Sequence, residues 1–390
     1  MPNVPNRWFM LLLLFFSRTA MGLQFQTVAS VRPFLMDTLA IDFTAIGVLI
    51  GLYMLPGVII AFPGGMLGQR FGAKGVVVVG LVLMVLGSIA MGMGSSFVGV
   101  AAGRLIAGTG AVLLNVMFTK MTADWFAGRE IVTAMAVLVS SWPLGLAVGL
   151  LVFGPVAEVQ GWRAVMYLSA VASAVALAAV AIGYRDPPDV LKTGPAHLSL
   201  NLTAREWLMV AIAGSIWAFF NVAYIVLISF VPEFFTLRGY SLSGAAQIVS
   251  LIGWFVIPAI PLAGLLAERL GRPNLLMAAG FAIVVLAAVI MPFVDAPLIP
   301  FGVIVLVIGV PAGLIMALPA QALGPQSRAA GMGVFFTFYY IAMAILPGGA
   351  GLARDISGSP SAPALFAAVM MLLCLLGLAS FNVAKRMKIA

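Results

Sequence analysis

The chain has 390 residues, of which 63% are hydrophobic and only 8% are charged, whereas about a quarter of the residues of a soluble globular domain are charged. Its 20 Lys and Arg outnumber 12 Asp and Glu, but this net charge of +8 is spread too thinly to form a nucleic-acid-binding surface. One cysteine, Cys374, and one histidine, His197, exclude a disulfide framework and a histidine cluster. The composition therefore excludes a water-soluble multidomain enzyme and predicts an integral membrane protein.

Apolar runs that are long enough to cross a hydrocarbon core of ~30 Å recur along the whole chain. The first run is too long for a signal peptide, and we expect it to be retained as a membrane helix. Prolines and glycines within the runs (Pro56-Gly57, Pro143, Pro258, Pro311 and Pro347-Gly348) indicate kinks in a buried helix bundle. The sequence predicts an all-α integral membrane protein with twelve transmembrane helices, over 8–30, 43–65, 75–95, 98–121, 131–155, 163–183, 206–230, 243–267, 273–293, 298–320, 330–350 and 362–384.

The lysines and arginines between these runs predict the orientation. With the N-terminus inside, fourteen of them face the cytoplasm and four face outside (Arg32, Arg163, Arg238 and Arg354), as the positive-inside rule requires. We therefore expect a multi-pass protein of the cell membrane (the inner membrane) with both termini cytoplasmic. The one long polar stretch, rich in proline, predicts a cytoplasmic linker at 185–204 between an N-terminal six-helix bundle at 1–184 and a C-terminal one at 205–390.

A loop motif occurs once in each predicted half, with the frame G-x-L-x-[Q/E]-R-x-G. Small residues let neighbouring helices approach closely, and an arginine with a polar partner can latch helix ends. We therefore interpret the motif as a conformational switch. Its residues are Gly65, Gln69, Arg70 and Gly72 in the first half, and Gly264, Glu268, Arg269 and Gly271 in the second.

Three further stretches accompany this motif: Arg104 to Gly110 (R-x-x-x-G-x-G) in the fourth span, Trp125-Phe126 with Arg129-Glu130 before the fifth, and Gly161-Trp162-Arg163 before the sixth. With them, the sequence resembles the major facilitator superfamily of secondary transporters, and more weakly its cyanate/nitroimidazole-type and anion-porter branches. The resemblance implies two pseudo-symmetric six-helix bundles around a central cavity that is lined by helices 1, 4, 7 and 10, with alternating access. Gln69 stands where most members have Asp, which weakens the charge-based latch.

Two arginines lie inside predicted spans. A charge near the bilayer centre costs about 2.5–3.5 kcal/mol even on the lenient insertion scale, so such residues tend to be functional. All twelve acidic residues fall at span ends or in loops, whereas Arg18 lies in the middle of the first span and Arg104 within the fourth. A substrate anion can balance this charge, because arginine binds planar oxyanions through two hydrogen bonds. The alternative for both arginines is a structural role in which they bond helix carbonyls or polar side chains and only hold helices together. For Arg104, a motif residue, this alternative is equal, whereas for Arg18 substrate contact is favoured.

Helical spacing adds polar and aromatic residues to the candidate pocket. For any single aromatic residue, packing or anchoring at the membrane interface is the competing interpretation. We expect no catalytic residues, metal or cofactor, no nucleic-acid partner, and a monomer. The predicted substrate-binding residues are Arg18, Tyr53, Arg104, Asn115, Trp142, Trp217, Asn221, Tyr224, Gln247, Trp254, Tyr339 and Tyr340.

The predicted function is secondary active or facilitative transport of a small organic or inorganic anion by alternating access. The alternative is proton-coupled efflux of a drug-like or other small molecule, which requires an embedded carboxylate that the spans do not show. A membrane enzyme or sensor would need a catalytic cluster, a phosphate-binding loop or an added soluble domain. The lone histidine falls in the linker, so no group of the cavity is expected to titrate near neutral pH.

Overall fold

A computed structural model of the chain describes residues 6–60, 68, 70–126, 130–187, 202–324 and 327–386, and within these ranges it contains helices and no strand. The all-α prediction is confirmed, and the predicted spans agree with the observed helices to within a few residues at most ends. The spans long and apolar enough to cross a membrane are Arg7–Ser30, Phe43–Ile60, Ala73–Met93, Phe97–Phe126, Thr133–Gln160, Trp162–Gly183, Ala204–Thr236, Leu242–Leu270, Pro273–Phe293, Leu298–Gln321, Ala330–Ser357 and Ala362–Arg386.

The chain divides into two compact units. Unit 1 comprises Met1–Ile41 and Leu52–Ala196, and unit 2 comprises Asp42–Gly51 and His197–Ala390. The helices of unit 1 are α1 (Arg7–Ser30), α2 (Arg32–Leu39), α5 (Ala73–Met93), α6 (Phe97–Phe126), α7 (Ile131–Gln160) and α8 (Trp162–Gly183). Those of unit 2 are α3 (Phe43–Leu52, which ends one residue into unit 1), α9 (Ala204–Thr236), α10 (Leu242–Leu270), α11 (Pro273–Ile290), α12 (Leu298–Val307), α13 (Val310–Ile315), α14 (Arg328–Ser357) and α15 (Ala362–Arg386).

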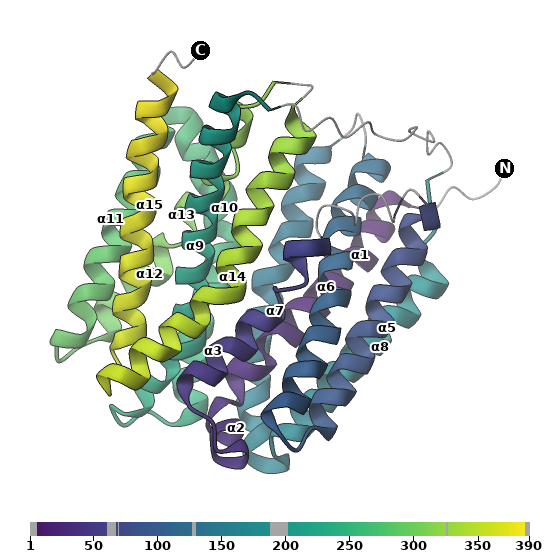
Figure 1. Cartoon of the computed structure of the whole chain (residues 1–390), viewed down its shortest axis with the longest axis vertical. Coiled ribbons are helices and arrows are strands. Elements are labelled where there is room, and N and C mark those ends of the chain that lie inside the picture. Colours follow the sequence, from purple (N-terminus) through teal and green to yellow (C-terminus); the bar gives the residue numbers. More distant parts are fainter. Residues whose placement is uncertain are drawn as a thin grey trace. The chain divides into compact units, whose positions relative to one another are not determined.

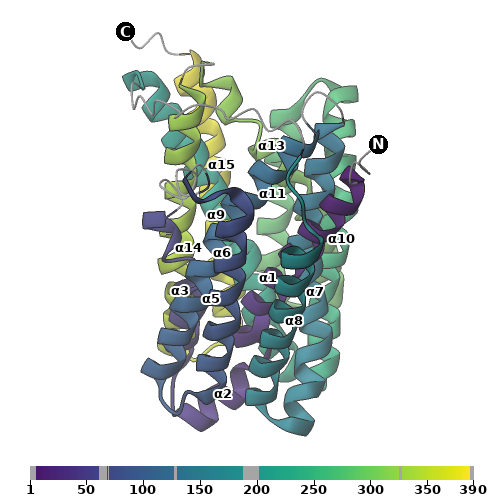
Figure 2. The same ribbon diagram turned by 90° about the vertical axis from the view of Figure 1, so that its right-hand side faces the viewer.

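In unit 1, α5 packs against α6 and α8, while α1 runs along α7 and α8 (Figure 2). Glycines bring α1 and α7 together: a Cβ atom added to Gly22 would lie 2.7 Å from the carbonyl oxygen of Trp142 and 3.1 Å from the Cα of Gly145. Such close approach of two backbones is the usual role of small residues in membrane helices. The crossing places Trp142 beside α1.

In unit 2, α14 and α15 both pack along α9 (Figure 1). The short helix α3 lies against α14 through Gly47 and Gly51, since a Cβ atom at either position would overlap the carbonyl oxygen of Pro347 or of Ala344. This spacing is the G-x-x-x-G pattern of closely packed membrane helices. The segment that precedes Leu52 is therefore part of unit 2 by packing, although it comes early in the sequence.

Two spans are interrupted near prolines. The second span is no longer α-helical after Leu52. Turns follow, one of them closed by the 2.9 Å hydrogen bond from Gly57 N to Met54 O, and the last segment of the span comes after these turns. The tenth span divides into α12 and α13, with Pro311 in the first turn of α13. Membrane bundles tolerate such breaks because neighbouring groups satisfy the freed backbone atoms.

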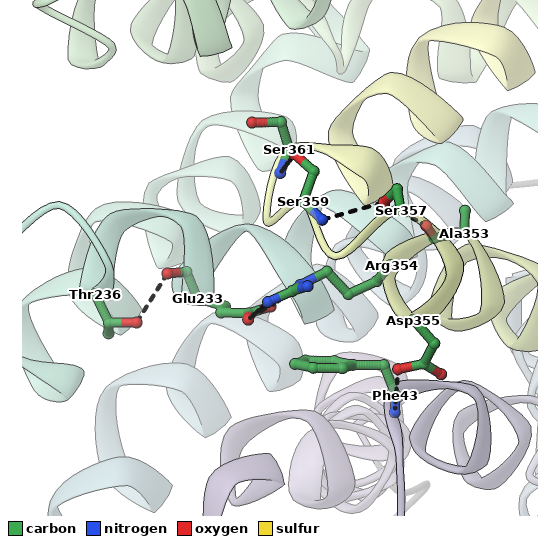
Figure 3. A network of polar contacts seen from close by, with 9 residues as sticks. All are labelled: Phe43, Glu233, Thr236, Ala353, Arg354, Asp355, Ser357, Ser359 and Ser361. Carbon is green, nitrogen blue, oxygen red and sulfur yellow. Dashed lines mark hydrogen bonds and ion pairs between the residues drawn. The ribbon is translucent and has the colours of Figure 1, made fainter.

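An ionic network joins three elements of unit 2 (Figure 3). Glu233, in the last turn of α9, accepts hydrogen bonds from Arg354 of α14 at 2.8 Å (Nη2) and 3.2 Å (Nε). The side chains of Arg354 and Glu233 are only 14% and 11% exposed. The guanidinium lies 4.7 Å from the ring centroid of Phe43, and Asp355 accepts bonds from the backbone N–H groups of Phe43 (3.2 Å) and Thr44 (2.7 Å). A carboxylate here satisfies the free N–H groups at the start of α3.

We expect Glu233→Gln to lower the free energy of unfolding by about 3–5 kcal/mol, because removing one partner leaves the other charge buried without its counter-ion. The measurement is thermal unfolding of the purified protein in detergent. Glu130→Gln is the matched control: Glu130 pairs with Arg7 at 2.8 Å, but its side chain is 51% exposed, and exposed pairs contribute about 0–1 kcal/mol. Equal effects of the two substitutions would contradict the prediction.

Candidate functional site

Arg18 lies in the middle of α1 and is part-buried. Its Nη1 donates a 2.9 Å hydrogen bond to the carbonyl oxygen of Leu138 in α7, and its Nη2 donates a 3.3 Å bond to Oδ1 of Asn115 in α6. These two acceptors orient the guanidinium but carry no formal charge. We call Arg18, Asn115 and the Leu138 carbonyl the Arg18 site.

The local structure of α7 shapes this site. The Oγ atom of Ser141 donates to the same Leu138 carbonyl at 2.5 Å. Pro143, two residues after Ser141, has no N–H group to donate to the carbonyl of Val139. Trp142 is part-buried next to this turn, and its ring centroid lies 5.3 Å from that of Phe25 on α1. The structure thus brings the predicted residues Arg18, Asn115 and Trp142 to neighbouring parts of α1, α6 and α7.

Arg104 is fully buried and has a different environment. Its Nη1 donates to the carbonyl oxygen of Gln24 at 2.9 Å and its Nη2 to that of Phe25 at 2.7 Å. The guanidinium also lies 4.5 Å from the ring centroid of Tyr53, while Gly108, one turn later, packs against the Tyr53 backbone. The arginine and the first glycine of the R-x-x-x-G-x-G motif therefore connect α6 to α1 and to Tyr53, which favours the structural alternative for Arg104.

A buried polar network extends from these residues and was not predicted. Gln24 Nε2 donates to the Met84 carbonyl at 2.7 Å and to Ser88 Oγ at 2.5 Å, and Ser88 Oγ lies 2.8 Å from Ser169 Oγ. Tyr53 Oη lies 3.1 Å from Gln24 Oε1. The sequence did indicate that Gln24 has polar partners, because a glutamine inside a membrane span needs them. It did not identify these partners, because α5 and α8 have no fixed sequence spacing from Gln24.

In unit 2, Trp217 of α9 is the centre of an aromatic cluster. Its ring centroid lies 5.9 Å from that of Phe220 and 6.3 Å from that of Phe335, with interplanar angles of 21° and 22°. Tyr339 of α14 lies 6.3 Å away, and Tyr340 packs against Tyr339 at 5.0 Å. We call Trp217, Phe220, Phe335 and Tyr339 the Trp217 cluster. Trp217 and Tyr339 are part-buried, whereas Phe220 and Phe335 are buried.

The remaining predicted residues of unit 2 have different surroundings. Asn221 donates from Nδ2 to the Trp217 carbonyl at 2.8 Å, so one side of its amide is used within α9. Tyr224 is buried, and its Oη has no hydrogen-bond partner among the described residues. Gln247 and Trp254 are exposed on α10, with Trp254 38% exposed, and belong to neither the Arg18 site nor the Trp217 cluster.

Part of the repeated loop motif can be described. Gly65 and Gln69 lie outside the described residues, whereas Arg70, Glu268 and Arg269 are exposed and Gly264 has open space beside it. The last glycine of the motif has a positive φ in both halves, +77° at Gly72 and +62° at Gly271. Side chains are strained in this region, which explains why the glycine recurs. The switch role of the motif remains a prediction.

The motif before α7 ties helix ends together within unit 1. Trp125 Nε1 donates to Tyr184 Oη at 3.1 Å, and the Phe126 ring packs edge-on against Trp8 at 5.0 Å. Burial, followed by the nearby carboxylate of Asp186, raises the pKa of Tyr184, so its hydroxyl stays neutral. Arg129 lies outside the described residues. No group of three His, Cys, Asp or Glu that could hold a metal ion occurs in the described ranges.

Comparisons with known proteins agree with this architecture. The sequence model of the Major Facilitator Superfamily matches residues 14–347. The hexuronate transporter of Bacillus subtilis is 28% identical over 153 residues, which cover 39% of this chain and 36% of that protein. The inner membrane transport protein YajR of Escherichia coli is 29% identical over 134 residues, covering 34% of this chain and 29% of that protein. The chain thus spans only about a third of the length of each of these relatives.

Solved structures match over almost the whole chain. The structure of a D-xylose-proton symporter matches with a TM-score of 0.78 at 14% identity, and the match covers 96% of this chain and 97% of the symporter chain. A bacterial homologue of the human lysosomal transporter Spinster has a TM-score of 0.74 at 16% identity, covering 98% of this chain and 97% of its own. At such identities the likeness concerns the fold alone.

We expect Arg104→Lys to destabilise the protein by about 1.5–3 kcal/mol, the range for a hydrogen bond to a charged group. A compact ammonium cannot reproduce the guanidinium fork that reaches both the Gln24 and Phe25 carbonyls. The measurement is thermal unfolding in detergent, with Arg18→Lys as the matched control, because Arg18 is only part-buried and should lose less stability. If Arg104→Lys unfolds at the same temperature as the wild type, the hydrogen bonds of Arg104 to α1 do not stabilise the protein and the prediction is wrong.

Proposed function

Because the chain belongs to the major facilitator superfamily, a family of membrane transporters, we propose that it carries a small anion across the membrane and binds this anion at the Arg18 site. The transport is secondary active or facilitative, with alternating access of the kind that repeat-built transporters use. The protein acts as a monomer in the cell membrane with both termini in the cytoplasm, and the repeated loop motif controls its change of conformation.

One observation carries this proposal: Arg18 lies in the middle of a membrane helix, where its guanidinium donates to the Leu138 carbonyl and to the Asn115 amide oxygen. An ionised side chain at this depth is costly and is therefore kept for function. The acidic residues of the sequence fall at span ends or in loops, so an anionic substrate is the natural source of a mobile negative charge. Arginine suits such a ligand because its fork binds a carboxylate through two parallel hydrogen bonds.

The match to a hexuronate transporter gives this proposal modest support, because a hexuronate is a carboxylate anion. The matching segment covers 36% of that relative, which is too little to transfer its substrate. Arg104 is left out of the proposed anion site, since its guanidinium already donates to two backbone carbonyls of α1.

We expect Arg18→Gln to abolish anion transport and Arg18→Lys to impair it severely, with a loss of about 2–5 kcal/mol in anion binding when the charge is removed. The measurement is uptake of radiolabelled anions by proteoliposomes, with the protein's folding checked by size-exclusion chromatography. Normal transport by either variant would show that Arg18 is structural and would remove the main support for anion transport.

Asn115→Asp tests whether a fixed negative charge next to Arg18 prevents the binding of an anionic substrate. It places a carboxylate where the Asn115 amide oxygen accepts a 3.3 Å bond from Arg18, so an internal anion competes with the substrate. We expect transport to fall at least as far as in Arg18→Gln while thermal stability is kept. The matched control Asn115→Ala removes the amide acceptor without adding a negative charge and should retain more transport. Equal transport rates for Asn115→Asp and Asn115→Ala would contradict the proposal.

Transport should respond to internal anion rather than to a pH gradient, because carboxylates and arginines titrate far from neutral pH. The measurement is uptake of a fully ionised substrate by liposomes that are empty or preloaded with unlabelled anion, with and without an imposed pH gradient. Trans-stimulation by internal anion, or a passive flux that follows the membrane potential, is expected. Concentrative uptake into empty liposomes driven by the pH gradient alone would favour proton coupling and would direct the search for a proton carrier to Asp37, Asp42 and Glu233 at the outer ends of the helices.

A further inference from the structure

An apolar groove lies between α11 and α12 of unit 2, two helices that pack side by side (Figure 1). Its volume is about 380 Å³, and every side chain that lines it is hydrophobic. Cavities of this size hold small molecules or parts of larger ones. The lining residues include Ile283, Ala287 and Ile290 on α11, Val294 in the loop that follows, and Ile299 and Val303 on α12.

The groove runs from one membrane surface towards the middle of the bilayer. The loop 294–297 joins two membrane spans and therefore lies at a membrane surface. Ile290, Ala287 and Ile283 follow one face of α11 away from this loop, and seven residues of α-helix cover about 10 Å of a hydrocarbon core of ~30 Å. Ile299 is 70% exposed, so the groove is open to the surrounding lipid. These dimensions suit part of an acyl chain.

Arg238 lies at the mouth of the groove, in the loop between α9 and α10. Its Nη2 donates to the Pro292 carbonyl at 2.8 Å, and its Nη1 donates to the carbonyl of the groove residue Val294 at 3.4 Å. The guanidinium also lies 4.2 Å from the ring centroid of Phe234. Within the described part of the chain these bonds use two of the five N–H groups of an arginine, and the side chain is exposed. Such a fork suits the oxygen atoms of a phosphate.

A carboxylate lies at the same mouth. Asp295 directly follows Val294, is exposed, and makes no hydrogen bond or ion pair with any residue of the described ranges. Charged side chains at a membrane surface are the groups that recognise lipid headgroups. A headgroup with a phosphate alone would be attracted by Arg238 and repelled by Asp295, whereas one that also carries an ammonium group matches both charges.

We propose that the groove is a phospholipid-binding site whose preferred occupant is phosphatidylethanolamine. One acyl chain lies in the groove, the phosphate binds Arg238, and the primary ammonium donates hydrogen bonds to Asp295. Phosphatidylglycerol has the phosphate but no ammonium, and the quaternary ammonium of phosphatidylcholine has no N–H group to donate. The site uses no residue of the Arg18 site, so this proposal goes beyond the proposed transport of an anion and does not depend on it.

The first experiment measures lipid binding to the delipidated protein by native mass spectrometry in detergent. The probes are phosphatidylethanolamine, phosphatidylcholine and phosphatidylglycerol with identical acyl chains. We expect phosphatidylethanolamine to bind at least about tenfold more tightly than the other two, which corresponds to about 1.4 kcal/mol. Equal binding of the three lipids would overturn the proposal. A dimer that forms only without lipid would assign the groove to a second copy of the chain and would also overturn it.

The second experiment assigns the headgroup contacts. Arg238→Gln should weaken all three lipids about tenfold, because each has a phosphate, whereas Asp295→Asn should remove only the preference for phosphatidylethanolamine over phosphatidylglycerol. Arg163→Gln is the matched control and should bind lipids as the wild type does. Arg163 is also exposed, donates to the Gly94 carbonyl at 3.4 Å and lies 4.5 Å from the ring centroid of Trp162, but it belongs to α8 of unit 1.

The third experiment places the acyl chain. Val303→Trp fills part of the groove and should weaken all three lipids about tenfold without changing their order. Leu306→Trp is the matched control, because Leu306 is 58% exposed on the same helix and does not line the groove. Thermal unfolding without lipid checks that each variant is folded.

Each contact of the proposed lipid can fail separately. Unchanged binding in Val303→Trp, or an equal loss in Leu306→Trp, would overturn the groove as the site of the chain. A preference for phosphatidylethanolamine that persists in Asp295→Asn would overturn the contact with the ammonium. An equal loss in Arg238→Gln and Arg163→Gln would show that any exposed arginine has this effect, and recognition of the phosphate at the groove would be wrong.

Discussion

The cost of placing a charged group inside a membrane governs the interior of this protein. The hydrocarbon core offers no water to an ion, so each buried charge needs oxygen atoms or an opposite charge supplied by the chain or by a ligand. The chain meets this requirement in three ways. Arg104 donates to helix carbonyls, Arg354 pairs with Glu233, and Arg18 donates to a helix carbonyl and to a side-chain amide oxygen.

Helix α1 connects Arg104 to Arg18, the arginine of the proposed anion site. Arg104 binds the Gln24 and Phe25 carbonyls of α1, and Arg18 lies six residues earlier on the same helix, about 9 Å along its axis. The close crossing at Gly22 and Gly145 then sets where α7 meets α1. The position of the Arg18 guanidinium therefore depends on packing at residues that need not touch the substrate.

The second span shows how the division into units departs from the order of the sequence. Helix α3 packs on α14 through Gly47 and Gly51, and its first N–H groups are held by Asp355, whereas Tyr53 lies buried in unit 1 beneath Arg104. The α-helix ends between these two attachments, at Leu52. A break of this kind lets one span belong to two compact units, because its two ends need not keep a common axis.

The sequence by itself determined the number and position of the membrane helices, because hydropathy is a local property and a span must match the thickness of the bilayer. It also singled out Arg18 and Arg104, since a charge inside an apolar run is visible without any contact. Only the tertiary structure distinguished the two arginines and gathered Trp217, Phe335 and Tyr339 into one cluster. It also placed Gln24 against Ser88 and exposed Gln247 and Trp254 on α10. The physical reason is that helical periodicity states which residues share a face of one helix, whereas the partner of that face depends on where helices cross.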